Sequence, residues 1–258
     1  MDGTPGRRIK TTDTVFDIVE ALTALDGATV TELATYLDLA PSTTHGHLAS
    51  LVHRGYVVRE GREYRTGLLF LGLGMTARRH YGLVQPAERA IERLARRTSL
   101  RTQLLVEENG RAIVVCRSAG DGQTESDVLG RVLPMHCSAG GKALLAFFPH
   151  ERVVEILDRH GLPRLTGNTI TDREDLFAEL ARVRERGFAT NEGESVRSVR
   201  AVGCPVVLGG RAIAAVTITG SEHIMDDDRL SREFSERALE ATNEIEMAVT
   251  DMDGSNVV

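Results

Sequence analysis

Three short helices followed by a charged hairpin, all within the first 70 residues, constrain this chain more than any other feature of its sequence. Apolar residues recur at helical spacing over residues 12–25, which predicts the first helix. A second helix is expected over Thr31–Leu37 with Thr31 as its N-cap, and a third over residues 41–55, beginning at a proline. Two strand-like pieces follow within residues 56–66. This order of elements predicts a winged helix-turn-helix.

The third helix and the hairpin carry the side chains that we expect to contact DNA. Recognition helices present their first turns to the major groove, where polar side chains bond to base edges and phosphates. Three hairpin arginines at a spacing of three could point toward one phosphate strand. The predicted DNA-binding residues are Ser42, Thr43, Thr44, His45, His47, Arg54, Arg59, Arg62 and Arg65. The alternative is that Ser42 and Thr43 only cap the helix and that the histidines are solvated.

The acidic charge of the chain restricts how it can bind DNA. The net charge is −6, which excludes a protein that coats nucleic acid through a broadly positive surface. Residues 1–66 contain seven basic and nine acidic residues, a net charge of −2. Any DNA contact must therefore be local, with basic groups gathered on one face and a dimer to multiply them. A winged helix that binds protein is the alternative.

Beyond the hairpin, the sequence predicts a linker helix and a larger α+β domain. The apolar content of the helix expected over Leu68–His80 indicates burial against a partner, and an amphipathic helix follows over residues 84–98. The expected domains are residues 1–67, a linker helix at 68–82, and residues 83–258. Strands are predicted at Gln103–Glu107, Ala112–Arg117, Val128–Pro134, Ala201–Leu208 and Ala212–Thr219, and helices near Ser138–Phe148, Glu151–Arg159, Arg173–Arg186 and Asp227–Asp251. Asn109-Gly110 and Gly209-Gly210 are hairpin-turn signals, so much of the sheet should be antiparallel.

A turn of small residues before the helix at 138–148 is a candidate anion site. The backbone amides around Ala139 and Gly140 would carry positive partial charge at the start of the helix, which suits a carboxylate. A nucleotide is not expected, because His136 stands where a phosphate-binding loop needs glycine. Alternatively, these small residues only allow the helix to pack closely on the sheet. In the late strand, Thr217 and Thr219 share one face and could offer two hydroxyls to a ligand, although threonine is also simply a good strand former.

Cysteine and histidine chemistry is sparse in this sequence. Cys116, Cys137 and Cys204 are odd in number and widely spaced, which fits neither a disulfide framework nor a metal clip. Cys137 follows His136, but adjacent residues on an extended strand point to opposite faces, so a cysteine-dependent enzyme using Cys137 is only an alternative. The histidines lack the i, i+4 spacing of helical metal ligands. We expect no metal and no cofactor.

No apolar run reaches the roughly 18 residues that a membrane span needs. The first ten residues are basic and have no apolar period, and they are expected to form a mobile arm. They also lack the apolar stretch of a signal peptide. The sequence therefore predicts a cytoplasmic protein without a membrane partner.

Four segments in this order resemble the IclR family of transcriptional regulators over essentially the whole chain. They are the winged helix with Ser42-Thr43 and Arg54-Gly55-Tyr56, then Pro134-Met135-His136 with Gly141-Lys142-Ala143, then Arg186-Gly187-Phe188 with Glu194 and Cys204-Pro205-Val206, and finally Ala214 to Gly220. The resemblance implies a GAF-like effector-binding domain over residues 83–258 and a homodimer or tetramer. It also implies that operator DNA binding responds to small organic acids or aromatic compounds, without catalysis.

The resemblance also implies the residues that hold the effector. They are Leu133, Ala139, Gly140, Asn191, Ala201, Thr217 and Thr219. Asn191 stands where an aspartate is frequent in the family, so the ligand need not be a small oxo acid. Gly46 stands where an arginine is common, which changes the expected operator sequence.

Overall fold

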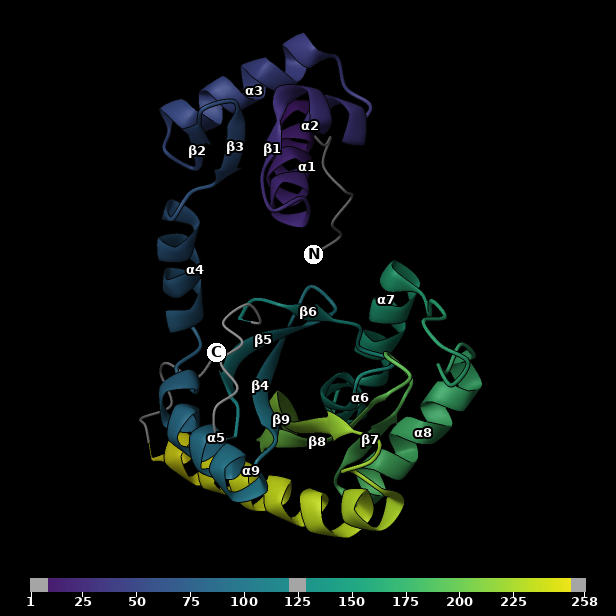
Figure 1. Cartoon of the computed structure of the whole chain (residues 1–258). Coiled ribbons are helices and arrows are strands. Elements are labelled where there is room, and N and C mark those ends of the chain that lie inside the picture. Colours follow the sequence, from purple (N-terminus) through teal and green to yellow (C-terminus); the bar gives the residue numbers. More distant parts are fainter. Residues whose placement is uncertain (1–8, 121–128, 252–258) are drawn as a thin grey trace. The chain divides into compact units, whose positions relative to one another are not determined.

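The chain divides into two compact units. The computed structural model describes residues 9–120 and 129–251, and the division falls between Ala77 and Arg78 (Figure 1). Residues 1–8, the larger part of the predicted basic arm, lie outside the described residues, as does Val128, where a strand was expected to begin. The two units are described separately.

The N-terminal unit is a three-helix bundle with a small antiparallel sheet. Its elements are α1 (Lys10–Ala24), β1 (Ala28–Thr29), α2 (Val30–Tyr36), α3 (Pro41–His53), β2 (Val57–Glu60) and β3 (Glu63–Thr66), with strand order β1-β3-β2. Ile18 and Leu22 of α1, Leu33 of α2 and Leu48 of α3 are almost completely buried and belong to one core. The predicted winged helix-turn-helix is confirmed.

The start of α2 differs from the sequence prediction. The N-cap is Thr29 and not Thr31, because Thr29 and Glu32 form a reciprocal capping box. The Thr29 side chain accepts a hydrogen bond from the Glu32 amide, and the Glu32 carboxylate accepts one from the Thr29 amide. This pair lowers the pKa of Glu32. Thr31 is the second residue of the helix, within its first turn.

Helix α4 (Leu69–Arg79) has an uncovered apolar surface. Leu71 and Leu73 of the helix are 63% and 55% exposed, Leu68 just before it is 86% exposed, and no residue of α4 is buried within the described chain. The sequence predicted that the apolar side of this helix is buried against a partner. No described part of the same chain buries it.

The C-terminal unit is built on one six-stranded antiparallel sheet. Its strands are β4 (Arg101–Glu108), β5 (Arg111–Ser118), β6 (Val132–Leu133), β7 (Ala189–Glu192), β8 (Val199–Leu208) and β9 (Arg211–Ser221), in the order β6-β5-β4-β9-β8-β7. Asn109-Gly110 and Gly209-Gly210 form the expected turns with positive φ angles. The predicted α+β class is confirmed. Two strands differ from the sequence prediction. Among the described residues, β6 ends before Pro134, because proline has no N–H to donate to a neighbouring strand. Strand β7 was not predicted.

Helices cover both faces of this sheet (Figure 1). One core contains side chains of α5 (Val84–Thr98), the π-helix η1 (Arg229–Phe234) and α9 (Ser235–Thr250). The other contains side chains of α6 (Ala139–Ala146), α7 (His150–His160) and α8 (Arg173–Arg186). Neighbouring residues alternate between the cores, as Leu104 joins the first and Leu105 the second. The single helix predicted over 227–251 is interrupted by η1.

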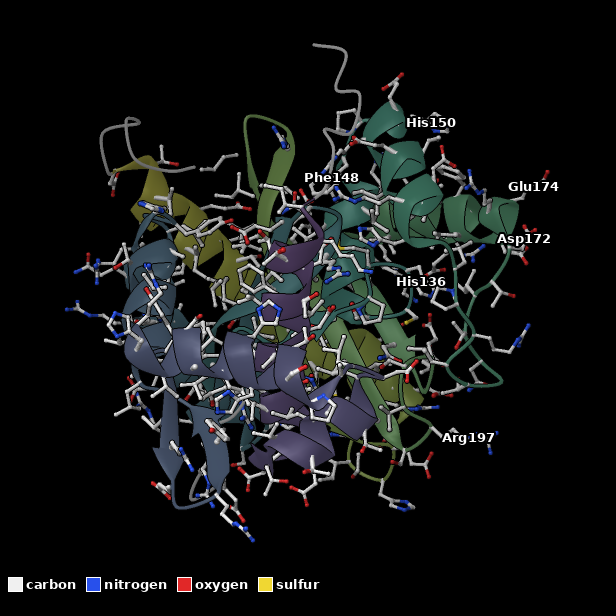
Figure 2. The ribbon with its side chains drawn as sticks, turned by 90° about the horizontal axis from the view of Figure 1, so that it is seen from above. His136, Phe148, His150, Asp172, Glu174 and Arg197 are labelled. Carbon is white, nitrogen blue, oxygen red and sulfur yellow. The ribbon has the colours of Figure 1, made fainter. Side chains whose placement is uncertain are left out.

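Two helices of this unit, α6 and α8, begin at side-chain caps. Asp172 accepts hydrogen bonds from the amides of Glu174 and Asp175, which fixes the start of α8 at the outer end of that helix (Figure 2). Ser138 caps α6 in the same way, with its hydroxyl accepting from the amide of Gly141. In the part of the chain that the structure describes, no helix is both long and apolar enough to cross a membrane.

Glycines let the first turn of α6 lie directly on the sheet. A Cβ atom at Gly203 in β8 would lie 2.5 Å from the carbonyl carbon of Ala139, and one at Gly140 would lie 2.6 Å from Leu105 Cδ1. A Cβ atom at Gly141 would lie 2.4 Å from the Met135 oxygen. A side chain at Gly203 or Gly141 would collide with backbone atoms, and one at Gly140 would collide with the side chains of Leu105 and Thr217.

We expect Gly203→Ala to lower the free energy of unfolding by about 1–3 kcal/mol, because the new methyl group collides with the backbone of α6. Gly167→Ala is the matched control, since a Cβ atom there would meet nothing within 4 Å, and its effect should stay within about 0.5 kcal/mol. Urea unfolding of the full chain measures both values. Equal stabilities of the two variants would contradict the close approach of α6 to β8.

Candidate functional site

A cavity of about 110 Å³ opens between the first turn of α6 and one face of the sheet. Its lining residues are Arg101, Gln103, Arg131, Leu133, Ser138, Ala139, Gly140, Asn191, Ser195, Val196, Val199, Ala201, Thr217 and Thr219. All seven residues that the sequence assigned to effector binding are in this set. They come from five separate segments of the chain, so the fold brings them together.

Strand register explains this convergence. Residues that pair directly across antiparallel strands lie on the same face of the sheet. One row across β4, β9 and β8 is Gln103, Thr217 and Gly203. The next row on that face, extended to β7, is Arg101, Thr219, Ala201 and Asn191. The cavity floor therefore consists of two neighbouring rows of side chains.

The first turn of α6 closes one side of the cavity with backbone amides. The first N–H groups of a helix have no acceptor within the helix, and the helix dipole gives them positive partial charge. Ser138 uses its hydroxyl on the amide of Gly141 and donates to the Pro134 carbonyl at 2.6 Å. The earlier amides, those of Ala139 and Gly140, belong to residues that line the cavity.

The hydroxyl of Thr217 is buried at the cavity without a hydrogen-bond partner among the described residues. Thr217 is 4% exposed, and its Oγ1 atom has no hydrogen-bond partner among the described residues. A buried hydroxyl without a partner costs roughly 1–3 kcal/mol. A ligand atom that bonds to this hydroxyl would recover that cost.

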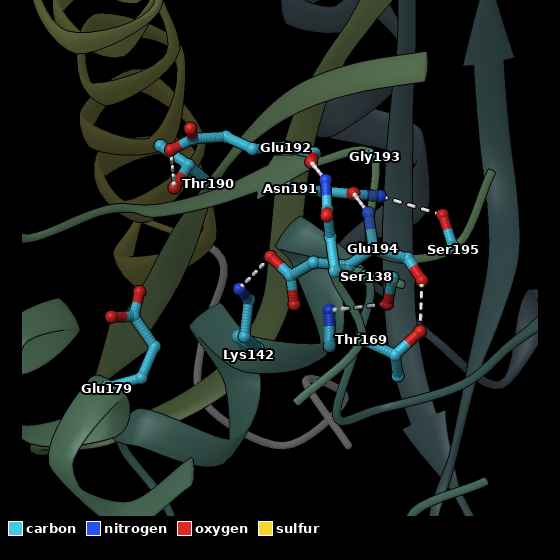
Figure 3. Close-up of polar contacts among 12 residues, drawn as sticks. Ser138, Lys142, Thr169, Glu179, Thr190, Asn191, Glu192, Gly193, Glu194 and Ser195 are labelled. Atoms are coloured by element: carbon cyan, nitrogen blue, oxygen red, sulfur yellow. Dashed lines mark hydrogen bonds and ion pairs between the residues drawn. The ribbon is translucent and has the colours of Figure 1, made fainter. Parts of the chain in front are cut away.

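Asn191 shapes the cavity through the loop that follows β7. Its Oδ1 atom accepts from the Glu194 amide and its Nδ2 atom donates to Ser195 Oγ, both at 2.8 Å (Figure 3). The Glu194 carbonyl in turn accepts from Thr169 Oγ1 at 2.7 Å. Both ends of the Asn191 amide are therefore engaged in holding the loop that carries Ser195.

A buried ion pair lies behind the amide turn of α6. Lys142 Nζ donates to Glu194 Oε1 at 2.5 Å, and the two residues are 1% and 7% exposed (Figure 3). Burial raises the pKa of Glu194, and the Lys142 charge opposes this shift. The pair joins α6 to the loop after β7. These two segments form two sides of the cavity. Lys142 and Glu194 belong to two separate sequence motifs, and the sequence alone did not predict that they form an ion pair.

Cys137 is not placed for nucleophilic chemistry. It lies with His136 in the turn before α6 and not on the extended strand that was expected, because the chain turns after Pro134. Burial raises the pKa of the Cys137 thiol to about 12, which disfavours the reactive thiolate. His136 bonds through Nε2 to the Pro163 carbonyl at 3.1 Å, and burial lowers its pKa. Nothing here supports the cysteine-enzyme alternative.

The other potential metal ligands and thiols of the described residues are dispersed or buried. No group of three or more His, Cys, Asp or Glu side chains within residues 9–120 and 129–251 could hold a metal ion. Cys116 and Cys204 are free and buried like Cys137, and burial raises their pKa values, that of Cys116 to about 11.

The candidate DNA interface lies on α3 and the β2–β3 hairpin of the N-terminal unit. Ser42, Thr43 and His45 are exposed and His47 is half-buried, while α3 contains no acidic residue. Exposed arginines follow at 54, 59, 62 and 65. A side chain added at Gly46 would meet nothing within 4 Å, so the space beside the recognition positions is open.

Two expectations about this surface are wrong. Thr44 is completely buried and its hydroxyl donates to the Ala40 carbonyl, so it cannot contact DNA. Arg59 pairs with Tyr64 and Arg65 with Val58, so neighbouring register positions put these arginines on opposite faces of the hairpin. They cannot all point toward one phosphate strand. Arg59 lies over the Tyr64 ring, 5.6 Å from its centre, and Arg65 pairs with Glu63 at 3.4 Å.

Family comparisons match both units. The description "IclR helix-turn-helix domain" matches residues 11–61, and "Bacterial transcriptional regulator IclR C-terminal" matches residues 75–247. The chain is 31% identical over 247 residues to the probable HTH-type transcriptional regulator ArcR of Halobacterium salinarum, covering 93% of this chain and 94% of that protein.

Solved structures share the fold. A putative transcriptional regulator from Rhodococcus sp. RHA1 superimposes with a TM-score of 0.79 at 21% identity, covering 95% of this chain and all of that chain. An IclR homologue of Microbacterium hydrocarbonoxydans, complexed with 4-hydroxybenzoate, has a TM-score of 0.74 at 24% identity, covering 92% and 99% of the two chains.

We expect Lys142→Met to cost about 3–5 kcal/mol of stability, because it leaves the Glu194 carboxylate buried without its partner. Adding Glu194→Leu should recover most of that loss, since no charge then remains buried. Arg173→Met is the control, because its ion pair with Asp158 is about half exposed and should be worth less than about 1 kcal/mol. Unfolding in urea measures each variant, and a double variant as unstable as Lys142→Met alone would contradict this account.

Proposed function

Because this chain belongs to the IclR family of transcriptional regulators, we propose that it binds operator DNA through α3 and the hairpin and that a small organic acid in the α6 cavity controls this binding. The family is one of DNA-binding regulators and not of enzymes. The observation that carries the effector proposal is the buried, unpartnered hydroxyl of Thr217 beside the amide turn of α6. Thr217, Thr219, Ala139 and Gly140 would hold the acid, with Leu133 and Ala201 as apolar walls and Asn191 positioning the loop.

A carboxylate suits this cavity for electrostatic reasons. Helix N-termini bind anions through their free amides and their dipole. The described lining residues include hydroxyl and amide groups that can bond to a carboxylate, and none of these described residues is acidic. In the related protein from Microbacterium hydrocarbonoxydans, the bound molecule is 4-hydroxybenzoate, which carries a carboxylate.

The DNA-binding proposal rests on the exposed first turns of α3. Ser42, Thr43, His45 and His47 would meet base edges and phosphates, and the arginines at 54, 59, 62 and 65 would meet phosphates from different sides of the wing. Because the domain is acidic overall, the absence of acidic side chains from α3 supports this helix as the contact.

A homodimer or tetramer would cover the apolar surface of α4. Leu68, Leu71 and Leu73 are more than half exposed, and a second copy of the same helix could bury them. Two copies would also present two recognition helices to a two-fold operator. The oligomer would have arrangements in which the recognition helices match the spacing of the half-sites and others in which they do not. Effector binding would change the relative stability of these arrangements.

We expect the double variant Thr43→Ala and His45→Ala to lose at least about tenfold in sequence-specific affinity, because each lost base contact costs roughly 1–3 kcal/mol. Ser50→Ala with His53→Ala, at the far end of the same helix, should bind normally. Fluorescence anisotropy with DNA from upstream of the chain's own gene and its neighbours, titrated over salt, measures both. Unchanged specific binding by the first variant would remove these residues from the interface.

We expect Thr217→Val with Thr219→Val to lose the thermal stabilisation that small carboxylic acids give the wild-type chain, while DNA binding persists. The substitution removes two hydroxyls and preserves the branched shape. Thr190→Val on β7 is the control, because Thr190 does not line the cavity. A panel of mono- and dicarboxylic acids in a melting experiment tests the difference. Full stabilisation of the double variant would show that the hydroxyls do not hold the acid.

A further inference from the structure

Arg78 attaches the last turn of α4 to the C-terminal unit. It is the last residue but one of α4, and the C-terminal unit begins with it. Its Nε atom donates to the Val115 carbonyl on β5 at 2.6 Å, and its guanidinium pairs with Glu88 on α5 at 2.5 Å. The Arg78 side chain is 21% exposed, so these bonds are partly shielded from water. The end of α4 is therefore held against β5 and α5.

The carbonyl that accepts from the arginine belongs to a β-bulge. Cys116 and Val114 pair with successive residues of β4, so the register skips Val115. Neighbouring residues of a regular strand point to opposite faces, yet Val115 and Cys116 both belong to the core on the α5 side of the sheet. A bulge leaves its extra residue out of the ladder, which makes the Val115 carbonyl available to a donor from outside the sheet.

The residue before the bulge holds part of the lining of the α6 cavity. The Val114 amide donates to the Arg131 carbonyl at 3.0 Å, and the Val114 carbonyl accepts from the Gly130 amide at 2.8 Å. Further along the same segment, Leu133 pairs with Ala112 of β5. Arg131 and Leu133 both line the cavity. One edge of the cavity is therefore bonded along β5, up to the bulge.

The two attachments are made by consecutive residues. Val114 holds the segment that lines the cavity, and Val115 holds the arginine at the end of α4. Consecutive peptide units are rigid planes that share a Cα atom, so a shift of one bonded group at this point changes the position of the other. The ladder is also disrupted locally at a bulge, so the strand yields there more easily than in a regular ladder.

We propose that Arg78 is the positioning residue through which an acid in the α6 cavity acts on α4. The bound acid contacts residues 131–133, the bulge moves with that segment, and Arg78 carries the movement into the helix that follows the DNA-binding hairpin in the chain. This proposal rests on the proposed function, because it specifies how the same cavity controls DNA binding. Without the bond from Arg78 to Val115, the two sites bind their ligands independently.

The test compares two substitutions of similar size at Arg78. The amide nitrogen of glutamine is as many bonds from Cα as the Nε atom of arginine, so Arg78→Gln keeps a donor for the Val115 carbonyl. Arg78→Met places a methyl group at the same position. Both variants remove the charge that pairs with Glu88. Arg89→Met, the same change at an exposed site on α5, is the control.

The quantity to measure is the factor by which an acid changes DNA affinity. Fluorescence anisotropy with the upstream DNA would give this factor for butyrate, succinate and 4-hydroxybenzoate, and calorimetry would give the acid affinity of the free protein. For the acid with the largest effect, we expect a factor of at least about fivefold in the wild type and less than about twofold in Arg78→Met. Arg78→Gln and Arg89→Met should keep most of the factor. The acid affinity of the free protein should stay the same in all variants.

Hydrogen exchange of the wild type gives a second test that needs no substitution. The amides of residues 75–79, in the last turn of α4, should change their protection when the acid binds, because Arg78 moves with the bulge. Unchanged protection there, with the acid bound, would overturn the proposal.

The other outcomes separate this proposal from the proposed function. If an acid changes DNA affinity equally in the wild type and in Arg78→Met, the coupling does not pass through Arg78, and the proposed function stands without it. Equal losses in Arg78→Met and Arg78→Gln would assign the coupling to the ion pair with Glu88 and would also overturn the proposal. If no acid binds, the effector part of the proposed function fails, and this proposal fails with it.

Discussion

The close approach of α6 to strand β8 is the constraint on which the C-terminal unit depends. With hydrogen in place of a side chain at Gly203, the first turn of the helix rests on the sheet, and its amides reach the same space as Thr217. The same placement brings Lys142 within reach of Glu194 on the loop after β7. The cavity wall, the amides of the first turn of α6 at the cavity and the buried ion pair all result from the close packing of α6 on β8.

The sequence was most informative where periodicity and turn chemistry agree. The alternation of Thr217 and Thr219 and the glycine turns at 110 and 210 are local properties, and the structure has them as expected. The convergence of Asn191 and Ala201 with Thr219 followed from family resemblance, because no local pattern shows that β7, β8 and β9 are neighbours. β7 itself is four residues long and carries Asn191 and Glu192, a composition too polar to indicate a strand.

The remaining site residues depend on register and burial, which a single sequence leaves open. Arg101 and Gln103 face the cavity only because β4 pairs with β9 in one of two possible phases. Thr44 was assigned to DNA because it stands among exposed polar neighbours, yet the helical turn directs it to the core. The wing arginines at 59 and 65 were grouped by spacing, and the pairing across the hairpin separates them.

The three buried cysteines have a consequence for how this protein responds to its environment. All three thiols of the chain are covered and resist ionisation, so thiol oxidation and disulfide exchange have no ready target in the native fold. The same property makes the natural chain a convenient background for spectroscopy, because one cysteine introduced on α3 would be the single site that a maleimide dye labels.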